Sequence, residues 1–146
     1  SLVFALFAVE IGLRLFWVPW DLRSTPGVAT EPIYGFAPLP GVEGVHITPE
    51  YSIHFQHSRQ GWRGEREYAR ERPAGISHRI LLLGDSFTYG YGSNNGETFA
   101  ALLQETWPDA EVANTGCNGY GTRNELAVLD HLGAAFQPDL AVIFFF

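Results

Sequence analysis

The chain has 146 residues, of which 46% are hydrophobic and 17% charged, so it is long enough for one domain with a core and too apolar for intrinsic disorder. Sixteen acidic residues against nine basic ones give a net charge of −7, which opposes binding to phosphates and excludes nucleic acid as an expected partner. The sequence has no methionine and ends in an apolar run at residues 139–146, so we expect a segment of a longer protein.

Residues 1–20 are predicted to form a transmembrane helix. Only two charged residues, Glu10 and Arg14, occur in this stretch, whose length is close to the roughly 20 apolar residues that span a bilayer. Their i, i+4 spacing allows them to pair, and Trp17 and Trp20 suit the membrane interface. The alternative is an amphipathic or buried helix of a soluble protein. We expect a membrane anchor, and the sequence leaves its orientation open.

Residues 21–75 are predicted to be a linker and pre-domain segment rich in proline and glycine. Five prolines and four glycines lie between residues 24 and 49, so neither a helix nor a central strand is expected there. The segment is either a linker or an irregular wrap that forms part of a cleft. Residues 51–55 alternate apolar and polar side chains and predict a short strand, and the charged run at 63–72 predicts a solvated surface.

Residues 76–146 have the pattern of an α/β domain. Short unbroken apolar runs at 80–83, 111–114 and 139–146 predict strands buried on both faces, and helical periodicity predicts helices at 97–107 and 123–136. This β-α-β-α-β order predicts an open parallel sheet with helices on both faces. The helix residues expected to face the sheet are Phe99, Leu102, Leu103 and Thr106 in the first helix and Leu126, Leu129, Leu132 and Phe136 in the second.

Ligands of such sheets bind at the carboxyl ends of the strands, which here means the loops at 84–92 and 114–122. The first loop places Ser86 directly after a buried strand, preceded by Gly84 and Asp85. A serine in this position can present its hydroxyl at the sheet edge beside a free backbone N–H. Short Gly, Asp and Ser clusters are also common in ordinary turns, so the position after the strand is what strengthens the signal.

The stretch from residue 80 to 90, with Gly84-Asp85-Ser86 at its centre, resembles the first sequence block of the GDSL or SGNH hydrolases. Residues 114–122, Asn-Thr-Gly-Cys-Asn-Gly-Tyr-Gly-Thr, resemble the second block of that family. The third strand is similar to the one that leads into the family's G-x-N-D block. The resemblance covers about residues 80–146, less than half of the chain.

The resemblance implies a flavodoxin-like, three-layer α/β/α SGNH-hydrolase fold with a parallel sheet, truncated after the third strand. It implies that Ser86 attacks an ester carbonyl and that the backbone N–H groups of Ser86 and Gly119 hold the developing oxyanion. Asp85 and Asn114 are expected to support the two loops. The third oxyanion donor and the D-x-x-H block that supplies the triad histidine and aspartate are expected beyond Phe146. We therefore expect residues 1–146 alone to be inactive.

The leading hypothesis is a membrane-anchored serine hydrolase with an extracytoplasmic catalytic domain, acting on a small-molecule, glycan or lipid ester. The alternatives are a glycan O-acyltransferase on the same scaffold and a non-catalytic SGNH-like binding module. Phosphate-binding glycine motifs are absent and a metal site at His54 and His57 is improbable, so no cofactor and no metal are expected.

Three further groups of side chains are expected to have structural roles or have two alternative roles. The five histidines are expected at the surface or in local hydrogen bonds. Cys117 is expected to be a small buried loop residue and not a nucleophile. Tyr89, Tyr91 and Tyr120 lie on the two loops at the sheet edge, where they line an acyl or sugar pocket or simply pack the loops.

Overall fold

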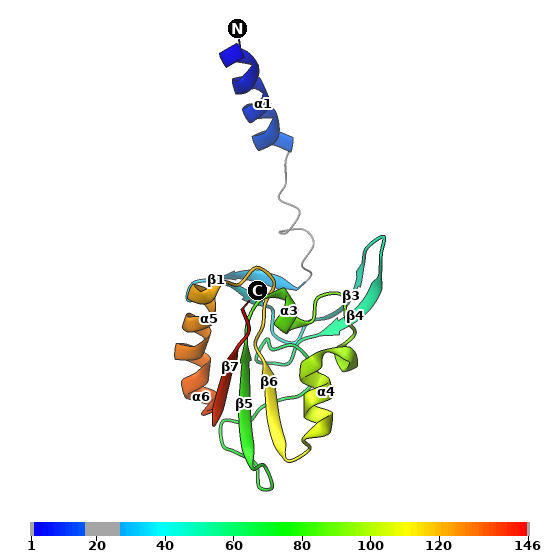
Figure 1. Cartoon of the computed structure of the whole chain (residues 1–146), viewed down its shortest axis with the longest axis vertical. Coiled ribbons are helices and arrows are strands. Elements are labelled where there is room, and N and C mark those ends of the chain that lie inside the picture. Colours follow the sequence, from blue (N-terminus) through cyan, green and yellow to red (C-terminus); the bar gives the residue numbers. More distant parts are fainter. Residues whose placement is uncertain (1, 17–26, 146) are drawn as a thin grey trace.

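A computed structural model describes residues 2–16 and 27–145 of the chain (Figure 1). The elements, in chain order, are α1 (Leu2–Phe16), β1 (Val28–Glu31), β2 (Gly35–Pro38), β3 (Glu43–Ile47), β4 (Ser52–Gln56), β5 (His78–Leu83), α3 (Ser86–Tyr89), η1 (Asn95–Glu97), α4 (Phe99–Thr106), β6 (Ala110–Asn114), α5 (Thr122–Val128), η2 (Leu129–Gly133), α6 (Ala134–Phe136) and β7 (Leu140–Ile143).

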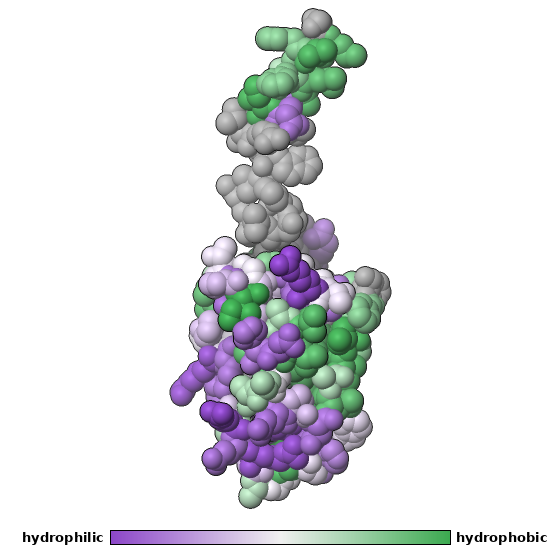
Figure 2. All heavy atoms as spheres, turned by 90° about the vertical axis from the view of Figure 1, so that its left-hand side faces the viewer, coloured by the Kyte–Doolittle hydropathy of each residue, from purple (hydrophilic) through white to green (hydrophobic). Residues whose placement is uncertain are grey.

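Helix α1 carries the apolar N-terminal sequence. It has 15 residues, and the face that Figure 2 shows is mostly apolar with a hydrophilic group near one end. Over residues 2–16 and 27–145, no helix combines the length and the apolar character needed to cross a membrane. The predicted interfacial residues Trp17 and Trp20 lie outside the described part of the chain, as does the side chain of Arg14. Membrane attachment therefore stays a prediction.

The centre of the fold is a parallel sheet with strand order β6-β5-β7. Leu81 and Leu83 of β5 pack with Val128 and Phe136 on one face, while α4 covers the other face, where Ile80, Leu82, Ala100 and Val112 meet. Helices therefore flank the sheet on both sides (Figure 1). This is the predicted three-layer α/β/α arrangement. The order β6-β5-β7 corresponds to strands 2-1-3 of a flavodoxin-like sheet.

Strand β7 differs from the prediction of a third buried strand. It runs from Leu140 to Ile143, shorter than the predicted 139–146, and Leu140 is 52% exposed. Within the described residues β7 pairs only with β5, so it lies at an edge of the sheet.

The sheet-facing side of α4 was predicted wrongly in part. Ala100 and Leu103 pack against the sheet as part of its core, whereas Leu102 is 51% exposed. Gln104 takes an inward position because its side-chain amide donates to Ala110 O and accepts from Val112 N, at 2.8 and 3.0 Å. A polar side chain thus serves the free backbone groups of edge strand β6, which hydrophobic periodicity cannot anticipate.

The predicted helix at 123–136 exists, but it contains a π-helical turn, η2, between α5 and α6. Val128 and Phe136 are buried and Leu129 and Leu132 pack beside them, while Leu126 points outward. An extra residue per turn rotates the positions that follow, so the inward face departs from a regular helical repeat.

The proline- and glycine-rich segment is not irregular throughout. Strands β1 and β2 form one antiparallel hairpin and β3 and β4 another, and the predicted strand at 51–55 is confirmed as β4, shifted by one residue. These two-stranded ribbons tolerate proline because an edge position need not donate an N–H, as at Pro38 at the end of β2.

Both hairpins are attached to the α/β unit. Asn124 of α5 donates to Tyr34 O at 2.6 Å, and Tyr120 donates to Phe36 O at 2.8 Å. On the other hairpin, the N–H groups of β4 donate to the side chains of Asn94 and Asn95. Of the two alternatives for this segment, the structure favours a wrap that packs on the domain.

The charged run at 63–72 returns the chain to β5 and is only partly a solvated surface. Arg63 is buried, and the backbone carbonyls of residues 69–71 accept hydrogen bonds from Arg79. Arg79 also forms a 2.7 Å ion pair with Glu111, and both side chains are at most 2% exposed. This buried pair joins β5, β6 and the return segment at the amino end of the sheet.

Candidate active site

Two loops meet at the carboxyl edge of the sheet, one after β5 and one after β6. The N–H of Cys117 donates to Gly84 O at 3.1 Å, and the side chain of Asn114 donates to Thr88 O at 2.7 Å. Gly116 approaches so closely that a Cβ there would lie 2.5 Å from the backbone nitrogen of Tyr89. The predicted juxtaposition of the two loops is therefore present.

Ser86 is the first residue of the short helix α3. Asp85 caps this helix, because its carboxylate accepts the N–H of Phe87 at 2.9 Å. The carbonyl of Ser86 accepts the N–H groups of Gly90 and Tyr91, at 3.1 and 2.9 Å. The Ser86 side chain is half-buried, and its hydroxyl has no hydrogen bond within the described residues. The backbone around this serine is thus held while its Oγ stays available.

Gly84 makes the close approach of the strand and helix possible. A Cβ at this position would lie 2.1 Å from Thr88 Oγ1 and 3.1 Å from Phe144 O, so no larger residue fits without displacement. The same contact places the end of β7 directly beside the Ser86 loop, where the N–H of Phe144 donates to Leu83 O at 2.9 Å.

Asn114 links the two loops from beneath. It is buried, and besides its bond to Thr88 its side-chain oxygen accepts the N–H of Gly116 at 3.1 Å. Its own carbonyl accepts the N–H of Arg63 at 3.0 Å. One amide side chain therefore sets the relative position of α3 and of the loop that contains Gly119.

Gly119 lies at the exposed tip of the second loop. Its φ of +83° is in the left-handed region that favours glycine, and the ring of Phe36 lies 3.5 Å from where a Cβ would be. Its N–H makes no hydrogen bond within the described residues. Two backbone donors, at Ser86 and Gly119, are thus on loops that are tied together.

Residues 82–145 match the model of the GDSL-like Lipase/Acylhydrolase family. The matched segment, under half of the chain, is similar to this family. The match includes both loops and strand β7, and the family is one of ester-hydrolysing enzymes. No curated protein matches the sequence.

A buried polar cluster that the sequence did not reveal lies between the pre-domain segment and α3. His57, expected at the surface or in a local hydrogen bond, is 1% exposed and contacts Tyr89, the last residue of α3, at 2.9 Å through Nε2. The guanidinium of Arg63 lies over the Tyr89 ring at 4.9 Å and bonds to Asn95 and to Ser93 O. One feature of the sequence could have pointed to this cluster: Tyr89 follows Ser86 by three residues.

Burial changes the titration of this cluster. It lowers the pKa of His57 to about 4, with the charge of Arg63 adding to the effect, so the imidazole is neutral at pH 7. Burial raises the pKa of the Tyr89 hydroxyl to about 12. The cluster therefore acts through hydrogen bonds and packing and does not supply a base.

Cys117 is the buried loop residue that was predicted, and burial raises the pKa of its thiol to about 12. Its thiol is thus protonated at neutral pH and a poor nucleophile.

The three loop tyrosines separate into different environments. Tyr89 and Tyr120 are buried and pack the loops, whereas Tyr91 is partly exposed. Tyr91 forms an edge-on aromatic group with His46 and Tyr51 of the second hairpin, with ring centroids 5.1 and 6.1 Å away. This group lies beside the Ser86 loop, because the N–H of Tyr91 bonds to Ser86 O.

Glu125 of α5 is a further buried group near this edge. Burial raises the pKa of its carboxyl group, and the charge of Asp85 adds to this. Over the described part of the chain, no group of three or more His, Cys, Asp or Glu side chains could hold a metal ion.

Proposed function

We propose that this protein is a serine hydrolase of O-acyl esters in which Ser86 is the nucleophile. The observation that carries the proposal is the position of Ser86, whose hydroxyl is free at the start of α3 and whose loop is bound to the Gly119 loop. The match of residues 82–145 to an acylhydrolase family supports the reaction class.

In the proposed reaction, Ser86 Oγ attacks the ester carbonyl carbon while a histidine base takes the hydroxyl proton. The tetrahedral intermediate collapses, the C–O bond to the alcohol breaks, and the same histidine protonates the leaving alcohol. Water, deprotonated by that histidine, then attacks the acyl carbon on Ser86. The C–O bond to Ser86 breaks, the histidine returns its proton to Oγ, and the acid is released.

The backbone N–H groups of Ser86 and Gly119 are the proposed oxyanion donors. Backbone donors held in place before the reaction need no reorganisation as negative charge develops on the carbonyl oxygen. Loss of one such donor typically lowers kcat by about 10²–10³. The bonds of Asn114 to Thr88 O and Gly116 N hold the two donors in register.

Two of the histidines, His57 and His78, are unsuited to act as the base. Both ring nitrogens of His57 are engaged, by Leu39 O and by the Tyr89 hydroxyl. His78 begins β5, at the opposite end of the sheet from Ser86. The family resemblance implies that the base is the histidine of a D-x-x-H block, and we propose that histidine as the base.

A fluorophosphonate probe on the intact protein tests this proposal. Covalent labelling is expected in the wild type and is expected to vanish in Ser86→Ala. Ser93→Ala is the matched control, because Ser93 lies on the same loop and its labelling should equal that of the wild type. An unlabelled but folded wild-type protein would exclude a nucleophilic Ser86 and favour a binding module. Acyl transfer to an added glycan in place of acid release would favour the acyltransferase.

A further inference from the structure

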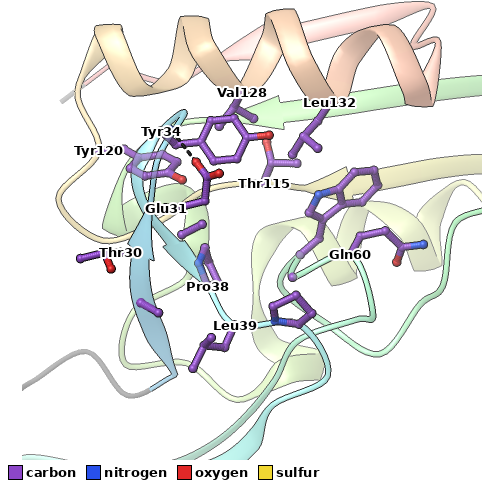
Figure 3. Close-up of a pocket in the computed structure, with 15 residues that line it drawn as sticks. Thr30, Glu31, Tyr34, Pro38, Leu39, Gln60, Thr115, Tyr120, Val128 and Leu132 are labelled. Atoms are coloured by element: carbon purple, nitrogen blue, oxygen red, sulfur yellow. Dashed lines mark hydrogen bonds between the residues drawn. The ribbon is translucent and has the colours of Figure 1, made fainter.

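A cavity of about 230 Å³ borders the second loop, and neither Ser86 nor Gly119 lines it. The β1–β2 hairpin and residues 60–62 form one side, and Val128 and Leu132 form the other (Figure 3). Thr115 and Tyr120, which flank Gly119 in the chain, complete the wall. The lining is mainly apolar and aromatic.

Most polar atoms of the lining already have partners in the protein. Thr115 Oγ1 donates to Leu82 O and the Tyr120 hydroxyl to Phe36 O. Gln60 donates to Tyr68 O, and Figure 3 shows its amide turned away from the other labelled side chains.

Among the lining side chains, two buried polar atoms have no hydrogen-bond partner in the described structure, Gln60 Oε1 and Trp62 Nε1, and Trp62 Nε1 is the donor of the two. Trp62 is 6% exposed, and its indole Nε1–H is buried. The hydroxyl of Tyr34, which also lines the cavity, makes no hydrogen bond within the described residues either. Buried donors are normally paired, so an unpaired indole N–H beside a cavity points to an acceptor atom that occupies it.

The charge at the cavity limits the kind of occupant. The carboxylate of Glu31 lies in the wall and accepts the N–H groups of Ile33 and Tyr34, at 2.6 and 2.7 Å. Its negative charge opposes an anionic ligand such as a fatty-acid carboxylate. Apolar walls with a few hydrogen-bonding groups are typical of sites for small, mostly apolar molecules.

We propose that this cavity binds an uncharged, largely apolar molecule with one acceptor oxygen, which receives a hydrogen bond from Trp62 Nε1. A cavity of roughly 150 Å³ holds benzene, so this one suits about nine non-hydrogen atoms, the size of a medium-chain alcohol. Its occupant contacts Thr115 and Tyr120 and so braces the second loop.

Thermal unfolding of the intact protein with 1-octanol as the probe tests the proposal. Binding to the folded state raises Tm, so octanol is expected to raise the wild-type Tm and octanoate is not. Trp62→Phe keeps an aromatic ring but removes the N–H, and its apparent affinity for octanol is expected to fall roughly fivefold. Trp107→Phe, at an exposed tryptophan, is the matched control and should keep the wild-type shift.

A second variant covers the case in which Trp62→Phe fails to fold. Ala29→Leu extends a cavity-lining side chain into the space and is expected to abolish the octanol shift. An equal shift in Ala29→Leu, an equal shift with octanoate, or no shift in the wild type would each overturn the proposal. Ser86→Ala should bind octanol like the wild type, which separates this site from the proposed catalytic function.

Discussion

His57 and Tyr89 form a buried hydrogen bond of 2.9 Å between the N-terminal wrap and the helix that begins with Ser86. The tautomer of His57 follows from its other contact. Leu39 O, 3.1 Å from Nδ1, can only accept, so Nδ1 carries the proton and Nε2 accepts from the Tyr89 hydroxyl. The wrap therefore fixes the end of α3, three residues from the proposed nucleophile.

Replacing His57 by phenylalanine should destabilise the fold and misplace α3. The variant leaves the Tyr89 hydroxyl and Leu39 O without their partner, which should lower the free energy of unfolding by about 1–3 kcal/mol. Urea denaturation measures this effect. His54→Phe is the control, because His54 is exposed and its pair with Glu43 is at the surface. Equal losses in the two variants would contradict a special role for His57.

The same residue predicts a pH dependence of stability. Burial lowers the pKa of His57 to about 4 in the folded protein, whereas the ordinary pKa of a histidine is near 6.5. Between these two pH values, His57 binds a proton in the unfolded chain but not in the folded protein. Stability is thus full above pH 6.5 and falls as the pH drops toward 4, by on the order of 3 kcal/mol. Urea midpoints measured from pH 7 to 4 should fall less steeply in His57→Phe. If the two proteins lose stability equally over this pH range, His57 is not the cause of the pH dependence.

The buried pair of Arg79 and Glu111 should be costly to break from one side. Glu111→Gln leaves the guanidinium of Arg79 buried without a counter-charge, and we expect a loss of about 3–5 kcal/mol in unfolding free energy. Glu43→Gln, which breaks an exposed contact to His54, should change stability little. Similar unfolding midpoints for the two variants would show that burial of the pair does not matter.

Gly84→Ala should disrupt the loop that carries Ser86. Its new Cβ would overlap Thr88 Oγ1, and relief of such overpacking typically costs about 1–3 kcal/mol. Gly121→Ala, where a Cβ meets nothing within 4 Å, is the control and should be neutral. The double variant Gly84→Ala/Thr88→Ala removes the Oγ1 and should recover part of the lost stability and of the probe labelling. If the double variant recovers neither stability nor labelling, contact with Thr88 Oγ1 is not the source of the strain.

Local patterns in the sequence were sufficient for the central unit and for the position of its site. An unbroken apolar run at 80–83 predicted a strand covered on both faces, and the chain order of strands and helices predicted the parallel sheet. Because parallel strands end at one edge, the sequence alone places Ser86 and Gly119 on neighbouring loops.

Other features depend on contacts between residues far apart in the chain. Gln104 faces the sheet because β6 is an edge strand with free backbone groups, so apolar spacing misassigned part of α4. Prolines and glycines suggested an irregular segment, yet the hairpins form because they pack on α5 and on residues 94 and 95.

The sequence therefore determined the sheet and the two loops at its carboxyl edge, since these follow from short-range pattern and strand direction. Only the tertiary structure decided that His57 and Arg63 are buried around Tyr89 and that a cavity borders the Gly119 loop. The physical reason is that burial is a property of the assembled fold. A polar side chain enters the interior only where partners from distant segments satisfy it, as Leu39 O and the Tyr89 hydroxyl do for His57.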